Sequence, residues 1–358
     1  MESSHFKFNN FKNKVFNKGS KLYDAGFIEE SQISEIDKSA QSYNLKIPQA
    51  YAEKILIKDE TDPVWKTAIP STEELKSSPG ESSDPISDER FSPVKGIIHR
   101  YPDRVLLMPT NICAVYCRYC FRKNTVGQPN KALKEDQLSL AISYIKNHSE
   151  IWEVILSGGD PLILSNKKLA HLMDCLNQIE HVKVIRFHTR IPVVSPSRID
   201  DELIHIIKRT IKTKKAVYVI THINHLQEID MAAEDACALL VDNGIPLLNQ
   251  SVLLKGINDN EEQMKALLKK LIEIRIKPYY LHHLDLTEGT NHFRTSIEEG
   301  QYIMKKLRGN ISGLCQPNYM LDIPGGYGKV PINHNYIGKG NDGWRIEDIN
   351  ENIHDYRY

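Results

Sequence analysis

The chain has 358 residues, of which 41% are hydrophobic and 26% are charged, proportions that are ordinary for a globular protein with a sizeable core. Its 46 basic and 46 acidic residues cancel, so no overall charge favours nucleic acid or an anionic membrane as a partner. No run of about eighteen apolar residues could span a bilayer, and the N-terminus lacks the apolar stretch of a signal peptide. We therefore expect a cytosolic protein that acts on small molecules.

The N-terminal part is polar and differs in composition from the rest of the chain. Residues 1 to 69 contain short periodic apolar runs and predict a few helices. Residues 70 to 93 are rich in Ser, Pro, Glu and Asp and cannot form a core, which indicates a linker or a strap over the surface. We divide the chain into an N-terminal helical region with its linker (1–94), a barrel (95–308) and a C-terminal segment (309–358).

From Arg104 onward the chain alternates short apolar runs with longer amphipathic ones. The short runs are continuously apolar, which is typical of parallel strands covered by helices. Six such βα units predict an α/β fold built on a partial (β/α)6 barrel of TIM type. The expected strand and helix pairs are 105–109 with 138–145, 154–156 with 169–176, 184–187 with 203–211, 217–220 with 232–240, 246–254 with 264–274, and 278–284 with 297–307.

Three cysteines follow the first expected strand at C-x3-C-x2-C spacing. Cys113, Cys117 and Cys120 can ligate three irons of a [4Fe-4S] cluster and leave the fourth iron open for a small molecule. This spacing is typical of radical S-adenosylmethionine (SAM) enzymes. A structural zinc site is the alternative, but zinc is normally closed by four ligands and no second cysteine pair follows. The remaining cysteines, Cys175, Cys237 and Cys315, are isolated in the sequence. Isolated cysteines in apolar surroundings usually behave as small hydrophobic residues.

A glycine-rich turn follows the second expected strand. Ser157, Gly158, Gly159 and Asp160 suit a loop whose carbonyl and carboxylate oxygens accept hydrogen bonds from the ammonium of SAM. The simpler interpretation is a tight turn whose aspartate caps the next helix, and the two are compatible.

A second glycine-rich loop, residues 322–329, ends in Lys329. It lacks the spacing of a P-loop, but a lysine on a permissive backbone suits a Schiff base with pyridoxal phosphate (PLP). Arg100, Tyr101 and Arg104 precede the first strand and could cradle a phosphate ester. Each group, taken alone, is more simply interpreted as a solvated lysine on a loop or as an ordinary charged turn.

Taken together, these motifs resemble the lysine 2,3-aminomutase family, whose members are PLP-dependent radical SAM enzymes. The resemblance runs from about residue 95 to 332. It is carried by the segments 100–104, 113–122, 157–162, 188–196, 221–225, 249–258, 292–295 and 322–329. It implies the partial barrel of the radical SAM class, with an N-terminal helical extension and a short C-terminal segment.

The resemblance also implies roles for single residues. Cys113, Cys117 and Cys120 would hold the cluster, while Ser157, Gly158, Gly159, Asp160 and His222 would line the SAM site. Lys329 is similar to the lysine that carries PLP, which Arg100, Tyr101, Arg104 and Gln250 would secure. Arg122 looks like the arginine that pairs with the substrate carboxylate, a bidentate task that suits guanidinium.

Substrate choice depends on Asp285 and Asp322, whose positions resemble those of the two aspartates that receive the remote ammonium of lysine. A buried ammonium is costly unless it is paired, so the expected reaction interconverts L-lysine and β-lysine. Aminomutases for arginine, ornithine or glutamate remain alternatives, as does a supplier of β-lysine for elongation factor P modification. The non-enzyme alternative is a metal-binding interaction protein in which the two aspartates only cap a turn and end a strand.

Two positions depart from the family pattern. His282 stands where a tyrosine is usual, and Tyr327 interrupts an all-glycine loop; both could alter the pocket. The resemblance further implies an electron donor such as flavodoxin or ferredoxin, and a possible homo-oligomer.

Overall fold

The structure, a computed structural model, describes residues 15–128, 132–340 and 342–357, so the first fourteen residues of the N-terminal region lie outside it. All six expected βα units are present within these ranges, which confirms the predicted fold class. Their bounds are β4 (Arg104–Thr110) with α5 (Glu135–Asn147), β5 (Glu153–Gly158) with α6 (Asn166–Asn177), β6 (Val184–Thr189) with α8 (Asp201–Lys212), β7 (Ala216–Thr221) with α9 (Met231–Asp242), β8 (Leu247–Val252) with α10 (Glu261–Glu273), and β9 (Ile276–His282) with α11 (Ile297–Leu307).

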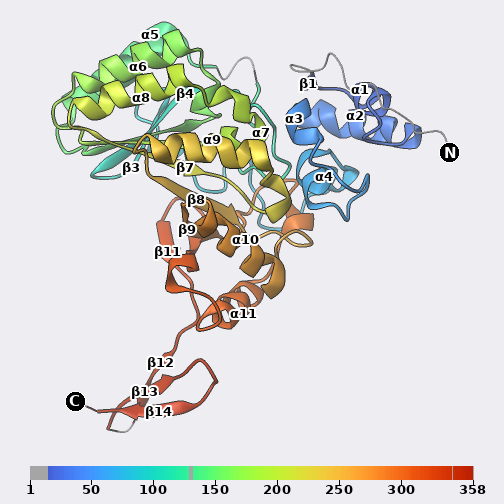
Figure 1. Cartoon of the computed structure of the whole chain (residues 1–358), viewed down its shortest axis with the longest axis vertical. Helices are drawn as coiled ribbons and strands as arrows, with labels where there is room; N and C mark the ends of the chain where they lie inside the picture. The colour runs from blue at the N-terminus through green and yellow to red at the C-terminus, as the bar shows by residue number, and fades with distance from the viewer. Residues whose placement is uncertain (1–14, 129–131, 341, 358) are drawn as a thin grey trace.

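The strands form one curved, open sheet in the order β11-β10-β9-β8-β7-β6-β5-β4-β3, and the connecting helices lie on its outer side (Figure 1). Strands β4 to β9 are parallel, and β10 (Asn318–Ile323) adds a seventh parallel strand beside β9. The edge strands β3 (Ile97–Tyr101) and β11 (Gly328–Pro331) are antiparallel to their neighbours. The carboxyl ends of the parallel strands therefore meet at one rim of the sheet.

Five of the six connecting helices, α6 and α8 to α11, are positioned by a side-chain N-cap and a buried stripe. In α8, for example, Asp200 accepts a hydrogen bond from the backbone N–H of Leu203 at 2.8 Å, a cap that contributes about 1 kcal/mol. Leu203, Ile204, Ile206 and Ile207 of this helix are buried, and each buried side chain of this size contributes roughly 1.5–3 kcal/mol. Shorter helical turns complete the connections: η5 (Pro161–Ile163), α7 (Ile191–Val194), η6 (Pro196–Arg198), η7 (Leu226–Glu228), η8 (Asn291–Phe293) and η9 (Gly313–Cys315).

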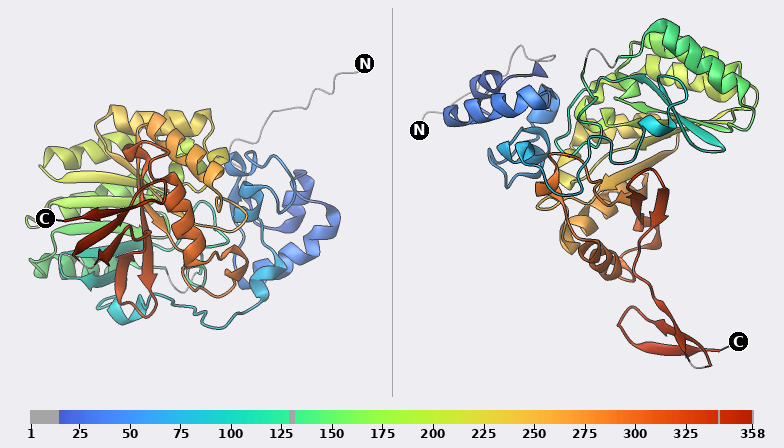
Figure 2. Two further views of the ribbon diagram at one scale, coloured as in Figure 1. Left: turned by 90° about the horizontal axis from the view of Figure 1, so that it is seen from below. Right: turned by 180° about the vertical axis from the view of Figure 1, so that it is seen from behind.

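The N-terminal region forms a small helical layer beside the sheet (Figure 2), as its periodic apolar runs predict. Its elements are β1 (Val15–Phe16), α1 (Gly19–Asp24), η1 (Glu30–Gln32), α2 (Ile33–Ser42), β2 (Ile47–Pro48), α3 (Gln49–Ala52) and α4 (Pro63–Ala68). The segment 70–93 contains only the short turns η2 (Thr72–Leu75) and η3 (Glu89–Phe91). It runs along the loops of the sheet rim, where the backbone N–H of Ser82 donates to the carbonyl of Leu286 at 2.9 Å. The division at residues 94 and 308 stays a prediction.

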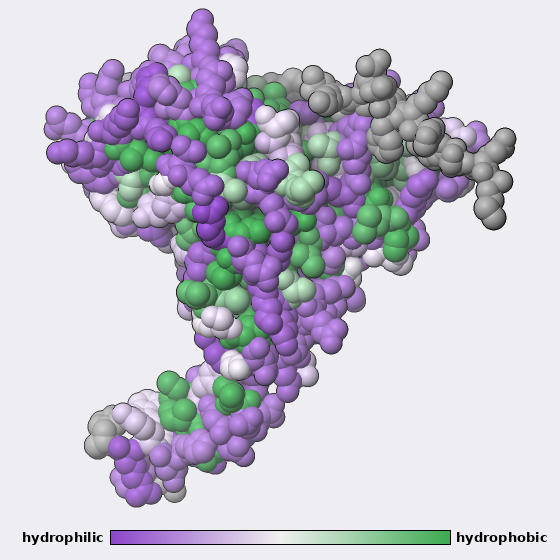
Figure 3. Space-filling view, in the orientation of Figure 1, coloured by the Kyte–Doolittle hydropathy of each residue, from purple (hydrophilic) through white to green (hydrophobic). Residues whose placement is uncertain are grey.

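Beyond β11 the chain forms an antiparallel meander of β12 (Ile337–Gly340), β13 (Gly343–Glu347) and β14 (Ile353–Tyr356). This meander projects from the body of the molecule and carries several apolar side chains on its surface (Figure 3). An ion pair connects it to α11: Nζ of Lys305 lies 2.6 Å from Oε1 of Glu347, the last residue of β13. None of the helices in the described ranges combines the length and apolar character that a bilayer crossing requires.

Candidate active site

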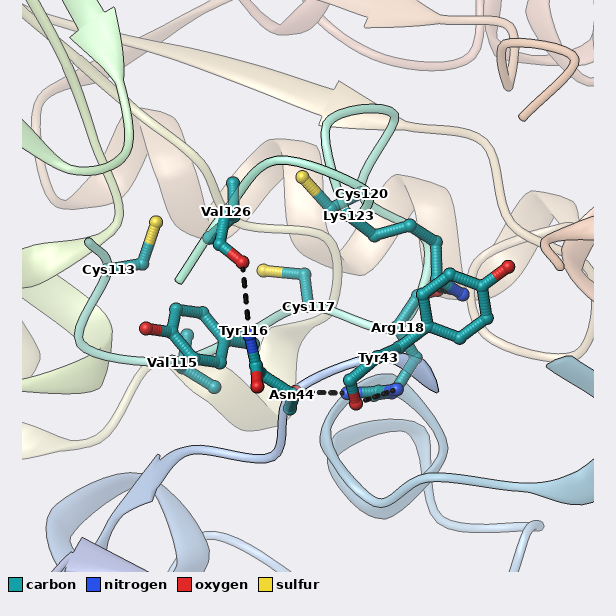
Figure 4. Close-up of a pocket in the computed structure, with 10 residues that line it drawn as sticks. All are labelled: Tyr43, Asn44, Cys113, Val115, Tyr116, Cys117, Arg118, Cys120, Lys123 and Val126. Carbon is teal, nitrogen blue, oxygen red and sulfur yellow. Dashed lines mark hydrogen bonds between the residues drawn. The ribbon is translucent and has the colours of Figure 1, made fainter. Parts of the chain in front are cut away.

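The three motif cysteines line one pocket at the carboxyl end of β4. Cys113, Cys117 and Cys120 all have free thiols, and their sulfur atoms face the same space (Figure 4). The N-terminal region closes this loop from the other side. The carbonyl of Lys46 accepts a hydrogen bond from the backbone N–H of Tyr116 at 3.0 Å.

The pocket disfavours bare thiolates, so the ionised cysteines need a cationic group between them. Burial raises the pKa of Cys113 well above its ordinary value, and the charges of Asp160 and the other two cysteines raise it further. Burial also raises the pKa of Cys120 to about 11. The three cysteines line one pocket and come from a single loop, and each thiolate of a cubane cluster takes a separate iron. The cysteines therefore fit the cluster.

Asp160 is committed to hydrogen bonds within the protein. Its carboxylate accepts from the hydroxyl of Thr189 at 2.7 Å, from the backbone N–H of Arg190 at 2.7 Å and from that of Leu162 at 3.1 Å. It thereby caps η5 and fixes the end of β6, as the turn interpretation expects. Gly159 is required because a Cβ atom there would lie 2.3 Å from the carbonyl oxygen of Ile112. Ser157 and Gly158 end β5 at the same rim.

The hairpin of β10 and β11 brings Lys329 opposite Asp322. The two residues are register partners, and Lys329 Nζ donates to Asp322 Oδ2. Gly328 has a φ of +100°, which favours glycine, and lets the backbone N–H of Lys329 reach the hydroxyl of Tyr101 at 2.9 Å. The side chain of Tyr327 is 74% exposed and so does not fill the pocket.

Arg100 and Tyr101 stand beside this lysine. Nη1 of Arg100 donates to Asp322 Oδ1 at 3.0 Å, while its Nε is buried without a partner among the described residues. The guanidinium of Arg104 lies over the ring of Tyr101, 4.0 Å from its centroid. A lysine, a phenol, a stacked arginine and an unsatisfied guanidinium N–H suit an aldehyde cofactor with an anionic phosphate, so these residues fit PLP.

Arg122 is held at one edge by an acidic residue of the segment 70–93. Both Nε and Nη2 of Arg122 donate to Oδ2 of Asp88, at 2.9 and 2.7 Å. Asp88 also lies 3.4 Å from Nη2 of Arg100. Within the described part of the chain, Nη1 of Arg122 carries no hydrogen bond. That edge of the guanidinium therefore remains available to a carboxylate.

Asp285 follows β9 and is partly buried, and its carboxylate makes no hydrogen bond or ion pair with the residues that the structure describes. Its pKa is raised to about 7: burial is the main cause, the charges of Asp322 and Asp88 add to it, and those of Lys329 and Arg122 oppose it. An ionised carboxylate here lacks a cation of its own. The environment therefore favours the entry of a cationic ligand group.

Three histidines, His188, His222 and His282, lie at the carboxyl ends of β6, β7 and β9. Nε2 of His222, at the end of β7, lies 2.8 Å from the hydroxyl of Tyr119 in the cysteine loop. Gln250 lies in β8, and its backbone contacts His222. Burial lowers the pKa of His222 to about 4 and that of His188 and His282 well below the ordinary value. All three imidazoles are therefore neutral near pH 7.

Three residues around Cys117 have no role in the sequence analysis. Arg190 donates from Nη1 to the sulfur of Cys117 at 2.8 Å and from Nη2 to Glu228 Oε2 at 2.7 Å and to the hydroxyl of Tyr51. Arg190 lies within the segment 188–196 that carries the family resemblance, and Glu228 lies three residues beyond the segment 221–225. Tyr51 comes from α3 and has no signal in the sequence, because only the fold brings it to this place.

Comparison with known proteins yields one family and several relatives. The family model of the radical SAM superfamily matches residues 107–271. The L-lysine 2,3-aminomutase of Acetoanaerobium sticklandii is 43% identical over 302 residues, which are 84% of this chain and 72% of that protein. That of Clostridium subterminale is 42% identical over 309 residues, 86% of this chain and 73% of that protein. The glutamate 2,3-aminomutase of Clostridioides difficile is 37% identical over 315 residues, 88% of this chain and 73% of that protein.

Proposed function

We propose, given that this chain belongs to the lysine 2,3-aminomutase family of radical SAM enzymes, that it interconverts L-lysine and β-lysine. As a member of the family it is an isomerase that uses a [4Fe-4S] cluster, SAM and PLP. The choice of lysine rests on one observation, the partly buried carboxylate of Asp285 that has no cation of its own among the described residues.

The cofactors divide between the two ends of the site. Cys113, Cys117 and Cys120 would hold the cluster, and Lys329 would hold PLP. The cluster and SAM supply, when bound, a radical that takes hydrogen from carbon, and PLP supplies the π-system that lets nitrogen move between neighbouring carbons. The protein itself has to bind the substrate at both ends and to keep water out.

Arg122 would bind the α-carboxylate of the substrate through its Nη1 edge. Asp88 holds the opposite edge of the guanidinium through Nε and Nη2, so the arginine is oriented before the substrate arrives. A guanidinium fixed in this way loses little conformational freedom on binding.

Asp285 and Asp322 would bind the ε-ammonium of lysine. Asp322 is paired with Arg100 and Lys329, and bonding of Lys329 Nζ to PLP would leave Asp322 with only Arg100. Asp285 has no such partner, so a bound ammonium would stabilise its ionised carboxylate more than that of Asp322. The neutral imidazoles of His188, His222 and His282 add no positive charge that would compete for these carboxylates.

The same carboxylates argue against glutamate. A substrate with a second carboxylate would place like charges together at Asp285, which is unfavourable in a partly buried site. Ornithine and arginine carry the required cation but differ from lysine in length or shape. These substrates are the alternatives that the experiment has to separate.

The test is turnover by anaerobic, reconstituted enzyme reduced with dithionite and supplied with SAM and PLP. We expect β-lysine from lysine and much slower reaction of ornithine, arginine, glutamate and uncharged 2-aminohexanoate, measured by chromatography and mass spectrometry. Preferred turnover of glutamate or of the uncharged analogue would overturn the proposal. In the Lys329→Ala variant we expect the PLP absorbance and turnover to disappear while iron content is unchanged.

A further inference from the structure

Arg190 is a buried cation in direct contact with a cluster cysteine. It follows β6, is 5% exposed, and places Nη1 2.8 Å from the sulfur of Cys117. Within the described part of the chain, it is the only guanidinium that donates a hydrogen bond to one of the three motif cysteines. An N–H that points at a thiolate is a charge-assisted hydrogen bond, which is stronger than a neutral one.

The guanidinium is fixed from its other side. Nη2 donates to Glu228 Oε2 at 2.7 Å and to the hydroxyl of Tyr51. Glu228 is held in turn, because its Oε1 accepts from the backbone N–H groups of Asn224 at 2.8 Å and His225 at 3.1 Å. The backbone N–H of Arg190 donates to Asp160. The Arg190 side chain therefore cannot rotate away from Cys117 without breaking its buried hydrogen bonds to Glu228 and Tyr51.

The N-terminal region takes part in this arrangement. Tyr51 is fully buried in α3, and the guanidinium of Arg190 lies over its ring, 4.8 Å from the centroid. The phenol also donates to Glu228 Oε2 at 3.2 Å. One residue of the helical layer thus positions both members of the Arg190–Glu228 pair beside the cysteine loop.

We propose that Arg190 is a positioning residue that raises the reduction potential of the cluster through its hydrogen bond to Cys117. Reduction adds one electron, taken from an external one-electron donor, and so adds one negative charge to the cluster and its thiolates. A fixed positive N–H donor at a thiolate stabilises that added charge more than it stabilises the oxidised cluster. Hydrogen bonds to sulfur and local charge are known determinants of such potentials. The inference rests on Cys117 as a cluster ligand, which is part of the proposed function.

The test is an EPR-monitored redox titration of anaerobic holoenzyme, with dithionite as the reductant. In Arg190→Gln we expect the reduced-to-oxidised ratio at a fixed potential to fall at least tenfold, which is 59 mV for a one-electron couple. Glu228→Gln should shift the potential in the opposite direction, because it removes a negative charge from the same network. Arg190→Lys, which keeps the charge but loses the fork of donors, should lie between the parent and Arg190→Gln.

The outcomes separate this inference from the proposed function. Iron and sulfide near four per chain in the parent, with a shifted potential in Arg190→Gln, support the inference. A parent that takes up no cluster overturns both proposals. A parent and variants with full iron content and the same potential overturn only the role of Arg190. If Arg190→Gln does not fold, Arg190→Lys and Glu228→Gln decide by the same criterion.

Discussion

Replacing Asp285 with asparagine tests the proposed choice of substrate, because the two side chains are nearly isosteric and differ in charge. The pKa of Asp285 is about 7, against an ordinary value of 3.8. Because a difference of one in pKa corresponds to about 1.4 kcal/mol, the ionised carboxylate is disfavoured by about 4 kcal/mol. An ammonium that pairs with it recovers part of this cost, and screening by water in a partly open site reduces the gain. We therefore expect kcat/KM for lysine to fall roughly 10²- to 10³-fold in Asp285→Asn.

The assay compares lysine with 2-aminohexanoate, which has the same chain without the terminal ammonium. The parent should prefer lysine strongly, and Asp285→Asn should lose most of that preference because both substrates then meet a neutral amide. Iron content and PLP absorbance serve as controls for intact cofactor sites. A variant that keeps lysine turnover within threefold of the parent, or that keeps its preference over the uncharged analogue, would refute the role of Asp285.

The pH dependence gives a second, independent readout. Only ionised Asp285 attracts an ammonium, so kcat/KM for lysine in the parent should rise as pH increases through about 7. This limb should be absent in Asp285→Asn. For stability the sign is opposite: because the folded pKa is raised, the favourable contribution of the protonated group is lost as pH rises toward about 7. Asp285→Asn should therefore resist urea better than the parent at pH 8, and the difference should shrink toward pH 5.

Two further substitutions test how the cysteine loop is held. Glu74→Gln should lower the free energy of unfolding by about 3 kcal/mol in a urea titration, because it leaves buried cations such as Arg118, 2.6 Å away, without a counter-charge. Burial alone would raise the pKa of Glu74, but the cations beside it lower it, so in the parent this stability is lost as pH falls through that lowered pKa. Gly159→Ala should reduce iron loading because its Cβ would meet the carbonyl of Ile112 at 2.3 Å, whereas Gly313→Ala, with nothing within 4 Å, should load like the parent.

The part of the fold that could be predicted from the sequence is the part encoded by local periodicity. Most of the expected strands are continuously apolar, the last two carry polar residues among apolar ones, and every expected helix has an apolar stripe, so all six units are found. The seventh parallel strand, β10, is as long as β5 to β8 but is not among the expected elements, because its polar residues Asn318 and Asp322 leave only a short apolar run between them. Its hairpin partner β11 is largely exposed and gives almost no hydrophobic signal. Yet this hairpin is what pairs Asp322 with Lys329.

The candidate site also contains some residues that can be recognised in the sequence and others that only the fold brings together. The cysteines and both glycine-rich loops are recognisable because their chemistry lies in a few adjacent residues. Arg190, by contrast, meets Tyr51 from 139 positions away and Glu228 from 38 positions away. No pattern in the chain connects such residues before it folds. The hydrogen bonds of Asp160 could be found only with the structure, because its carboxylate accepts from residues at the end of a different strand.

The segment 70–93 shows that a region unable to form a core can still orient residues of a candidate site. Its composition predicts a linker or a strap, and three of its carboxylates bind arginines on loops that follow barrel strands. These pairs are Glu74 with Arg118 at 2.6 Å, Asp88 with Arg122 at 2.7 Å, and Glu81 with Arg294 at 2.9 Å. Each arginine is thereby oriented, and its charge is balanced, by a residue outside the barrel. A parallel sheet fixes the positions at which its loops begin but not the positions of the side chains further along them. The segment 70–93 supplies the carboxylates that hold the charged ends of three of these side chains in place.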